Sequence, residues 1–197
     1  MQTDTPDFWE SKWKENETPW DLGVSSPQLM DFCINNIENR TSKILIPGGG
    51  RAYELTTLHN AGFTNVWLCD WSKSAIEEAQ KVNPAIPQDK FLVKDFFKLK
   101  MNFDYILEQT FFSAIPPSMR EEYVEKTYKL LKERQGRIIA LLFDIHFDHE
   151  GPPFGGSRKE YREIFSSRFT IERLEKAEKS VASRAGNECF LVAIADS

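Results

Sequence analysis

The residues best suited to bind an anionic ligand are three consecutive glycines, Gly48, Gly49 and Gly50, and an aspartate further along the chain, Asp70. The glycines follow the apolar run 43–47, which is typical of a buried strand, and precede a helical pattern. Glycines at such a turn permit positive φ values and let a ligand approach the backbone, while the N-terminus of the next helix attracts negative charge. Asp70 ends a second strand, where a carboxylate can accept hydrogen bonds from ribose hydroxyls.

This pattern favours S-adenosylmethionine (SAM) over other adenosine cofactors. The nicotinamide fingerprint G-x-G-x-x-G would place its third glycine at Tyr53, which is too bulky for the close helix and strand packing of that motif. No G-x-x-x-x-G-K-[ST] motif occurs, which disfavours a P-loop. SAM has no pyrophosphate, and its methionine carboxylate would lie over the glycines with its ribose on Asp70. The alternative is that the glycines form only a turn and that Asp70 only caps a helix.

Two residues after the third predicted strand could bind an adenine ring. Asp95 can accept a hydrogen bond from the adenine amino group, and Phe96 offers a stacking surface at the sheet edge where ligands bind in such folds. Asp95 taken alone would more often be a helix cap. Trp71, directly after the ribose carboxylate, could lie against the same ring or pack in the core.

The N-terminal segment, residues 1–32, carries three of the five tryptophans. Trp9 and Trp13 are four residues apart and share one face of a helix, while Trp20 follows a Thr-Pro break. One interpretation is that this helix only packs on the domain. The other is an aromatic lid, with Trp9 packing and Trp13 or Trp20 facing the cofactor, because an indole face attracts a sulfonium cation.

The elements that position these residues are those of an α/β fold, which the sequence predicts from strands that alternate with helices around a mostly parallel sheet. The wholly apolar run 137–143 is typical of a strand buried on both faces. The last two strands have no long helix between them, which predicts a C-terminal hairpin at the sheet edge. The predicted strands are 43–47, a strand ending at Asp70, 90–94, 103–108, 137–143, 170–176 and 189–195, and the predicted helices are 31–39, 51–61, 72–82, 120–133 and 159–165.

Length, composition and charge indicate what kind of protein this is. A length of 197 residues with 41% hydrophobic and 28% charged residues predicts one domain, with 43–197 as its α/β core. A net charge of -5 and no basic cluster argue against a nucleic-acid partner. Three scattered cysteines indicate a reducing compartment, and we see no signal peptide or transmembrane run. We therefore expect a cytoplasmic protein, monomeric, with a small-molecule substrate and no membrane association.

Several motifs in this order resemble the thiopurine S-methyltransferase superfamily, particularly its halide and thiol methyltransferase branch. They are W-x-x-x-W-x-x-x-x-x-x-W from Trp9, P-G-G-G-R around the glycine turn, F-F-x-A-I-x-P-x-x-R from Phe111 and G-P-P-F from Gly151. The similarity runs from about Phe8 to Phe165. It implies a seven-stranded, Rossmann-like class I methyltransferase that moves the methyl group of SAM, by in-line displacement, to a small soft nucleophile: a thiol, hydrosulfide, thiopurine, selenium compound, halide or thiocyanate.

The resemblance also implies roles for individual residues. Trp13 and Trp20 match aromatic residues around the cofactor, and Gly48 matches the contact at the glycine turn. Gln109 falls beside the cofactor where relatives have tyrosine or arginine, and Glu108 falls where they usually have aspartate. Two further matches are Asp70 with the ribose acid and the pair Asp95 and Phe96 with the adenine site.

The loop after the fifth strand, FDIHFDHEGPPF, could cap the acceptor. We expect the substrate pocket to be lined by Trp20, Phe112, Arg120, His146 and Phe154, with a histidine or Arg120 retaining an anion. Arg120 could equally pair with glutamates on its own helix. His146 and His149 beside acidic residues suggest a metal cluster, but no third ligand has a fixed spacing, so we expect no metal. A soft anion needs no general base, and we expect catalysis by positioning alone.

Three other functions share parts of this pattern. A nucleotide-cofactor oxidoreductase would also use Asp70. A catalytically silent scaffold would keep the fold and bind SAM weakly. A methyltransferase with a small oxygen or nitrogen acceptor would keep the whole cofactor site.

Overall fold

Runs of buried apolar residues form one seven-stranded sheet in the computed structural model, which describes residues 5–197. The strand order is β3-β2-β1-β4-β5-β7-β6. The first five strands are parallel, and β7 is antiparallel to both β5 and β6. The strands are β1 (Ile44–Pro47), β2 (Val66–Asp70), β3 (Phe91–Val93), β4 (Tyr105–Gln109), β5 (Arg137–Phe143), β6 (Phe169–Lys176) and β7 (Glu188–Ala195).

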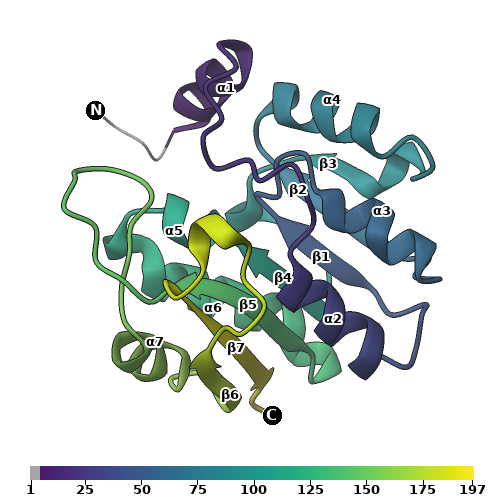
Figure 1. Cartoon of the computed structure of the whole chain (residues 1–197). Helices are drawn as coiled ribbons and strands as arrows, with labels where there is room; N and C mark the ends of the chain where they lie inside the picture. The colour runs from purple at the N-terminus through teal and green to yellow at the C-terminus, as the bar shows by residue number, and fades with distance from the viewer. Residues whose placement is uncertain (1–4) are drawn as a thin grey trace.

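Helices cover both faces of the sheet (Figure 1). One face packs against α2, α3 and α4, and the other against α5, α6 and α7. The first helix, α1, belongs to neither layer and contacts the start of α4. The helices are α1 (Pro6–Lys14), α2 (Pro27–Asn36), α3 (Tyr53–Asn60), α4 (Lys73–Val82), α5 (Phe111–Ala114), α6 (Arg120–Leu131) and α7 (Arg158–Phe165).

The central strand β1 shows why the buried strands have apolar residues at consecutive positions. Ile44 and Ile46 face the cluster that contains α2, α3 and α4, while Leu45 faces the cluster on the other side. Side chains along a strand alternate between faces, so a strand covered on both sides must be apolar at every position. The sheet therefore has two buried faces.

The carboxyl ends of β1, β2, β3 and β4 meet at one edge of the sheet. Parallel strands end at the same side, and the residues after these four strands are Gly48, Trp71, Lys94 and Thr110. The turn after β1 leads into α3, and Ser72 caps α4 through a hydrogen bond from the Ala75 amide to its side chain at 3.0 Å. The fold thus brings residues from four separate parts of the sequence to one edge.

The predicted seven-stranded α/β architecture and its C-terminal hairpin are confirmed, with one helix displaced. The structure begins α2 at Pro27, four residues before the predicted start, because Ser26 accepts a hydrogen bond from the Leu29 amide and Pro27 takes the first helical position. Leu29 and Met30 lie in the core, so this part of the predicted 1–32 lid is a packed layer instead. Residues 1–4 of that segment lie outside the described residues.

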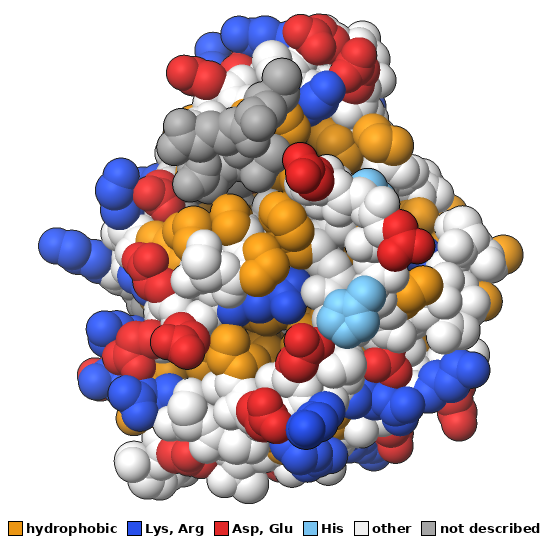
Figure 2. All heavy atoms as spheres, turned by 90° about the vertical axis from the view of Figure 1, so that its left-hand side faces the viewer, with side chains coloured by type: hydrophobic (Ala, Val, Ile, Leu, Met, Phe, Trp, Pro, Cys, Tyr) orange, Lys and Arg blue, Asp and Glu red, His pale blue; other side chains and the backbone are white. Residues whose placement is uncertain are grey.

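None of the helices in the described part of the chain has the length and apolar character that crossing a bilayer requires. On the side of the molecule where α5 and the loop before α7 lie, apolar side chains gather in the middle of the surface, with charged side chains around them (Figure 2).

Candidate functional site

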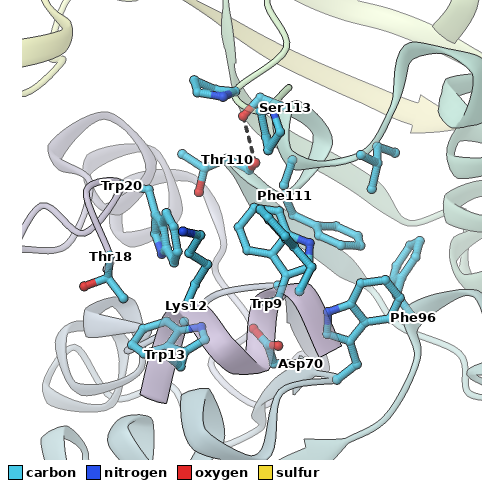
Figure 3. A pocket seen from close by; sticks show the side chains of 18 of the residues that line it. Trp9, Lys12, Trp13, Thr18, Trp20, Asp70, Phe96, Thr110, Phe111 and Ser113 are labelled. Atoms are coloured by element: carbon cyan, nitrogen blue, oxygen red, sulfur yellow. Dashed lines mark hydrogen bonds between the residues drawn. The ribbon is translucent and has the colours of Figure 1, made fainter. Parts of the chain in front are cut away.

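A cavity of about 1320 Å³ lies at the carboxyl edge of the sheet, and it brings together most of the residues predicted to bind the cofactor. Figure 3 shows Asp70 at its floor, with Trp13 and Trp20 on one side and Phe96 on the other. The predicted cofactor residues that line this cavity are Trp13, Trp20, Gly48, Gly50, Asp70, Trp71, Asp95 and Phe96.

The glycine turn forms one wall of the cavity. Gly48 (φ +54°) and Gly50 (φ +55°) have left-handed backbone conformations, which glycine adopts without strain. The Gly48 amide donates a hydrogen bond to the Cys69 carbonyl at 2.7 Å, which joins the turn to β2. A Cβ at Gly50 would lie 3.0 Å from the Trp13 ring. The absence of that carbon keeps the turn and the N-terminal aromatic residues close together.

Gly49 differs from its two neighbours because it does not line the main cavity, and its contact with the cofactor stays a prediction. A Cβ at Gly49 would lie 2.7 Å from Ile46 and 2.8 Å from Leu68, so its α-carbon faces the apolar core. Gly49 borders only a smaller recess of about 60 Å³, which shares Trp13, Trp20 and other wall residues with the cavity. The middle glycine is therefore required for packing.

Asp70 is a buried carboxylate, 9% exposed, at the end of β2. Its Oδ1 accepts a hydrogen bond from the Ser72 amide at 2.9 Å. Burial raises the pKa of Asp70 to about 6, although hydrogen bonds from the amides of Ser72, Gly50 and Trp71 act in the opposite direction. An acceptor in this position, with its charge poorly solvated, suits a ligand that brings hydroxyl donors.

The adenine end of the predicted site is held rigidly. Phe96 stacks on Tyr123 with ring centroids 5.3 Å apart and meets Phe111 edge-on at 5.3 Å. Asp95 accepts a hydrogen bond from the Phe97 amide at 2.9 Å and pairs with the Lys98 ammonium at 3.2 Å. Asp95 thus caps a short helical turn and also lines the cavity, so the two roles considered for it are compatible.

Three indoles form a cluster over the cavity. Trp20 meets Trp9 at 5.3 Å and Trp13 at 6.0 Å between ring centroids, both in edge arrangements. Trp13 is only 7% exposed, and the Arg51 guanidinium lies 5.2 Å from its ring. Trp9, which we expected to serve only in packing, also lines the cavity.

The two residues at the end of β4 lie apart from the main cavity. Gln109 borders the smaller recess. Glu108 is fully buried and accepts hydrogen bonds from the Phe112 amide and the Tyr123 hydroxyl, each at 2.9 Å. Burial raises the pKa of Glu108 to about 7, although these two hydrogen bonds lower it. Glu108 fixes the start of α5 through the Phe112 amide. The glutamate side chain, which is longer than the aspartate expected at this position, therefore has a structural role.

Four of the five residues predicted for the substrate pocket do not line the cavity. Phe112 is 1% exposed and packs in the core against Tyr123 and Tyr161. His146 is 70% exposed, lies 3.8 Å from Glu160 and does not line the cavity. Trp20 alone lines the cavity as expected.

The other two form a clamp behind the cavity wall. Arg120 is 8% exposed and donates hydrogen bonds to the carbonyls of Phe154 at 3.2 Å and Gly155 at 2.8 Å. The Phe154 amide donates to the Ser113 carbonyl at 2.7 Å. Arg120 therefore fixes the loop before α7 and does not line the cavity, and its side-chain hydrogen bonds within residues 5–197 go to carbonyls, not to the glutamates of its own helix.

The loop itself contributes to the wall through residues that the motifs did not single out. Phe147, Pro152 and Pro153 line the cavity, as do Ser113 from α5 and Arg184 from the β6–β7 connection. Arg184 donates to the Trp20 carbonyl at 3.0 Å, lies 3.5 Å from Glu188, and sits 5.3 Å from the Phe143 ring. No sequence motif marks Arg184, because only the return of the hairpin brings it to this edge.

Within the described residues, no three His, Cys, Asp or Glu side chains are grouped in a way that could hold a metal ion. The cavity instead combines a polar, glycine-containing wall with an apolar wall that carries a single arginine among Phe143, Phe147, Pro152 and Pro153.

Comparison with known proteins identifies the family. The model of the thiopurine S-methyltransferase family matches residues 4–195. The chain belongs to the thiopurine S-methyltransferase family. It is therefore a SAM-dependent methyltransferase, and the glycine turn, Asp70 and the adenine end provide a cradle that fits this cofactor.

Similar proteins agree with this membership. A probable thiol methyltransferase 2 of Arabidopsis thaliana is 32% identical over 169 residues, which are 83% of this chain and 74% of the relative. Thiocyanate methyltransferase 1 of Brassica oleracea is 31% identical over 186 residues, 91% of this chain and 81% of the relative. The crystal structure of a magnesium protoporphyrin IX methyltransferase from Synechocystis PCC 6803 with bound SAH has a TM-score of 0.73 at 16% identity and 97% coverage of each chain, which shows the shared fold.

Proposed function

We propose that this thiopurine S-methyltransferase family member transfers a methyl group to a small soft nucleophile, namely a thiol, hydrosulfide, thiopurine, halide or thiocyanate. The proposal is supported by one cavity that is lined on one side by residues suited to the cofactor and on the other by residues suited to an anionic acceptor. The cofactor-type wall contains Asp70, Gly48 and Gly50, and the apolar wall carries Arg184. Both reactants would be held in one space that excludes water.

The residues of the first wall would hold SAM and release S-adenosylhomocysteine (SAH). Asp70 would accept hydrogen bonds from the ribose hydroxyls, Phe96 and Trp71 would flank the adenine, and the glycine turn would face the methionine carboxylate. When bound, SAM supplies an electrophilic methyl group on a sulfonium centre. The indoles that line the cavity would cover that cationic group and exclude water, which would strengthen its electrostatic attraction for an anionic acceptor.

The second wall would hold the acceptor. Arg184 is a cation fixed by the Trp20 carbonyl and Glu188, so an anionic nucleophile can approach it without a large movement of the side chain. Phe143 and Phe147 remove water from the acceptor and leave it less solvated. A thiolate, hydrosulfide or halide carries its own lone pair and negative charge, so no residue is required to take a proton.

A panel of acceptors tests the proposal. The purified protein is incubated with SAM and, separately, iodide, thiocyanate, hydrosulfide, 6-mercaptopurine, thiophenol and catechol, and methylated products are measured by mass spectrometry or headspace gas chromatography. We expect methylation of at least one sulfur or halide acceptor and a weak reaction with catechol. Methylation of catechol alone, or of none of these acceptors, would contradict the proposal.

We further propose that the chain acts as a single domain and a monomer, in the cytoplasm, on a small molecule, with residues 5–22 as the lid over the cofactor. The net charge of -5 and the position of the cavity at the sheet edge support a soluble small-molecule enzyme over a nucleic-acid-binding protein. Light scattering coupled to size exclusion tests the monomer, and a mass of twice 22.8 kDa would contradict it.

A further inference from the structure

One carboxylate outside the cavity wall ties α1 to the rest of the molecule. Glu10 accepts hydrogen bonds from the Ser72 hydroxyl at 2.8 Å, the Ser74 hydroxyl at 2.7 Å and the Ser74 amide at 3.1 Å. These donors belong to the N-terminus of α4, where the helix dipole adds a favourable interaction with a negative charge. Partial burial raises the pKa of Glu10, but the hydrogen bonds from Ser74 and Ser72 outweigh it and lower the value to about 2.

The residues of α1 on either side of Glu10 form the roof of the site. Trp9 and Trp13 line the cavity, whereas Glu10 does not. Because Glu10 is held at α4, the two indoles that flank it are held over Asp70 and the glycine turn. The contact also reaches the floor of the site, since the Ser72 amide donates to Asp70 and its hydroxyl donates to Glu10.

The next part of the segment is anchored elsewhere. Asp21 pairs with the Arg51 guanidinium and accepts a hydrogen bond from the Tyr53 hydroxyl at 3.4 Å, and the Trp20 carbonyl accepts one from Arg184. These anchors hold residues 20 and 21 to α3 and to the β6–β7 connection. Glu10 is therefore the charged anchor to α4 on the α1 side of the lid.

We propose that Glu10 is a positioning residue that holds α1 closed over bound cofactor and product, and that release of this contact lets the product leave. The inference rests on the proposed function, because it assumes that SAM and SAH occupy the cavity beneath α1. Glu10 acts through Ser74 and Ser72 and does not touch the reacting atoms.

The local structure allows this contact to be removed cleanly. Ser72 already caps α4 through the Ala75 amide, so α4 keeps its cap when the Glu10 carboxylate is lost. Ser74 is the better partner to change, because its hydroxyl donates the shortest of the three hydrogen bonds to Glu10 and it does not line the cavity. A matched control is Glu77→Ala, which removes an exposed carboxylate from the same helix where it pairs only with Lys73 among the described ion pairs.

The experiment measures the dissociation rate of SAH by stopped-flow tryptophan fluorescence in wild-type protein, Glu10→Ala, Glu10→Gln, Ser74→Ala, Glu10→Ala/Ser74→Ala and Glu77→Ala. Four of the five tryptophans line the cavity, so their emission reports on the bound ligand. We expect the Glu10→Ala rate to rise about tenfold, as loss of charge-assisted hydrogen bonds predicts, and the Glu10→Gln rate to rise less. The KM for the acceptor should stay within about twofold, since the acceptor wall is untouched.

The double variant shows whether Glu10 acts through Ser74. Its rate should equal that of Glu10→Ala, because the hydrogen bond that Ser74→Ala removes is already absent when Glu10 is replaced. A Glu10→Ala rate equal to those of wild type and Glu77→Ala would overturn the proposal while leaving the function intact. If Glu10→Ala does not fold, an unchanged rate in both Glu10→Gln and Ser74→Ala has the same meaning. Wild-type protein that binds neither SAM nor SAH would instead overturn the proposed function, and this inference with it.

Discussion

At the scale of single residues, the cofactor site depends on a carboxylate whose charge is costly to bury. We predict that Asp70→Asn weakens SAH binding by about 1.5 to 3 kcal/mol, because an amide removes the charge and one of the two acceptor oxygens that ribose hydroxyls would use. Isothermal titration calorimetry measures this change. Equal affinities of the variant and the wild-type protein would show that Asp70 only caps the turn to α4.

The raised pKa of Asp70 makes a second prediction. The carboxylate is the form that accepts hydroxyl donors, so SAH affinity should be nearly constant above about pH 7 and fall as the pH drops through about 6, the folded-state pKa of Asp70. The SAH affinity should fall by at most about tenfold for each unit of pH. The affinity of Asp70→Asn should not change over the same range. A wild-type affinity that is flat between pH 5 and 7 would argue against a ribose contact at Asp70.

At the scale of elements, the loop before α7 is a part of the acceptor wall that is fixed from behind. Arg120 holds the carbonyls of Phe154 and Gly155, and Gly156 donates to the Ile145 carbonyl at 2.9 Å. A Cβ at Gly155 would overlap that same carbonyl. The loop is therefore built as a closed unit whose outer turn carries Phe147, Pro152 and Pro153 to the cavity.

We predict that Arg120→Ala raises the KM of the acceptor about tenfold, because the loop loses two hydrogen bonds from a charged donor. SAH affinity should stay within about twofold, since Arg120 lies behind the acceptor wall only. Steady-state kinetics with the best acceptor, together with SAH titration, separates the two effects. A matched change on the same helix, Glu121→Ala, removes an exposed side chain and should alter neither quantity. A loss of SAH affinity as large as the rise in KM would indicate general destabilisation.

At the scale of the whole molecule, Glu108 links stability to pH. Its folded-state pKa of about 7 lies above the ordinary value of 4.5, so the folded protein binds the proton more tightly than the unfolded chain does. The stabilisation from this proton is present below pH 4.5 and is lost as the pH rises to 7. Over that range it is worth on the order of 3 kcal/mol at about 1.4 kcal/mol per pKa unit.

Replacement by glutamine isolates this effect. Glu108→Gln has no charge at any pH, so we predict that wild-type protein loses stability relative to the variant between pH 4.5 and 7, with a constant difference above pH 7. Urea unfolding at several pH values measures the difference. A difference that stays constant from pH 4.5 to 7 would show that the carboxyl keeps its ordinary pKa.

Local sequence patterns predict most of the fold and the cofactor wall of the site. Gly48, Asp70 and Asp95 each lie at or just after the end of a strand that the sequence predicts. Because a parallel topology brings strand ends to one edge, the cofactor wall was predictable. The acceptor wall was not. Arg184 reaches it only because β7 reverses beside β5, and Arg120 bonds a loop more than thirty residues away, Phe154 and Gly155. Side chains that are positioned by long-range returns of the chain leave no local pattern.

The three cysteines give the protein a practical property. Cys33, Cys69 and Cys189 are all buried, and burial raises the pKa of each thiol to about 12. Thiols in this state react slowly with disulfide reagents. The thiol acceptor that remains can therefore be titrated with a chromogenic disulfide dye in samples withdrawn at intervals, with little colour contributed by the enzyme itself.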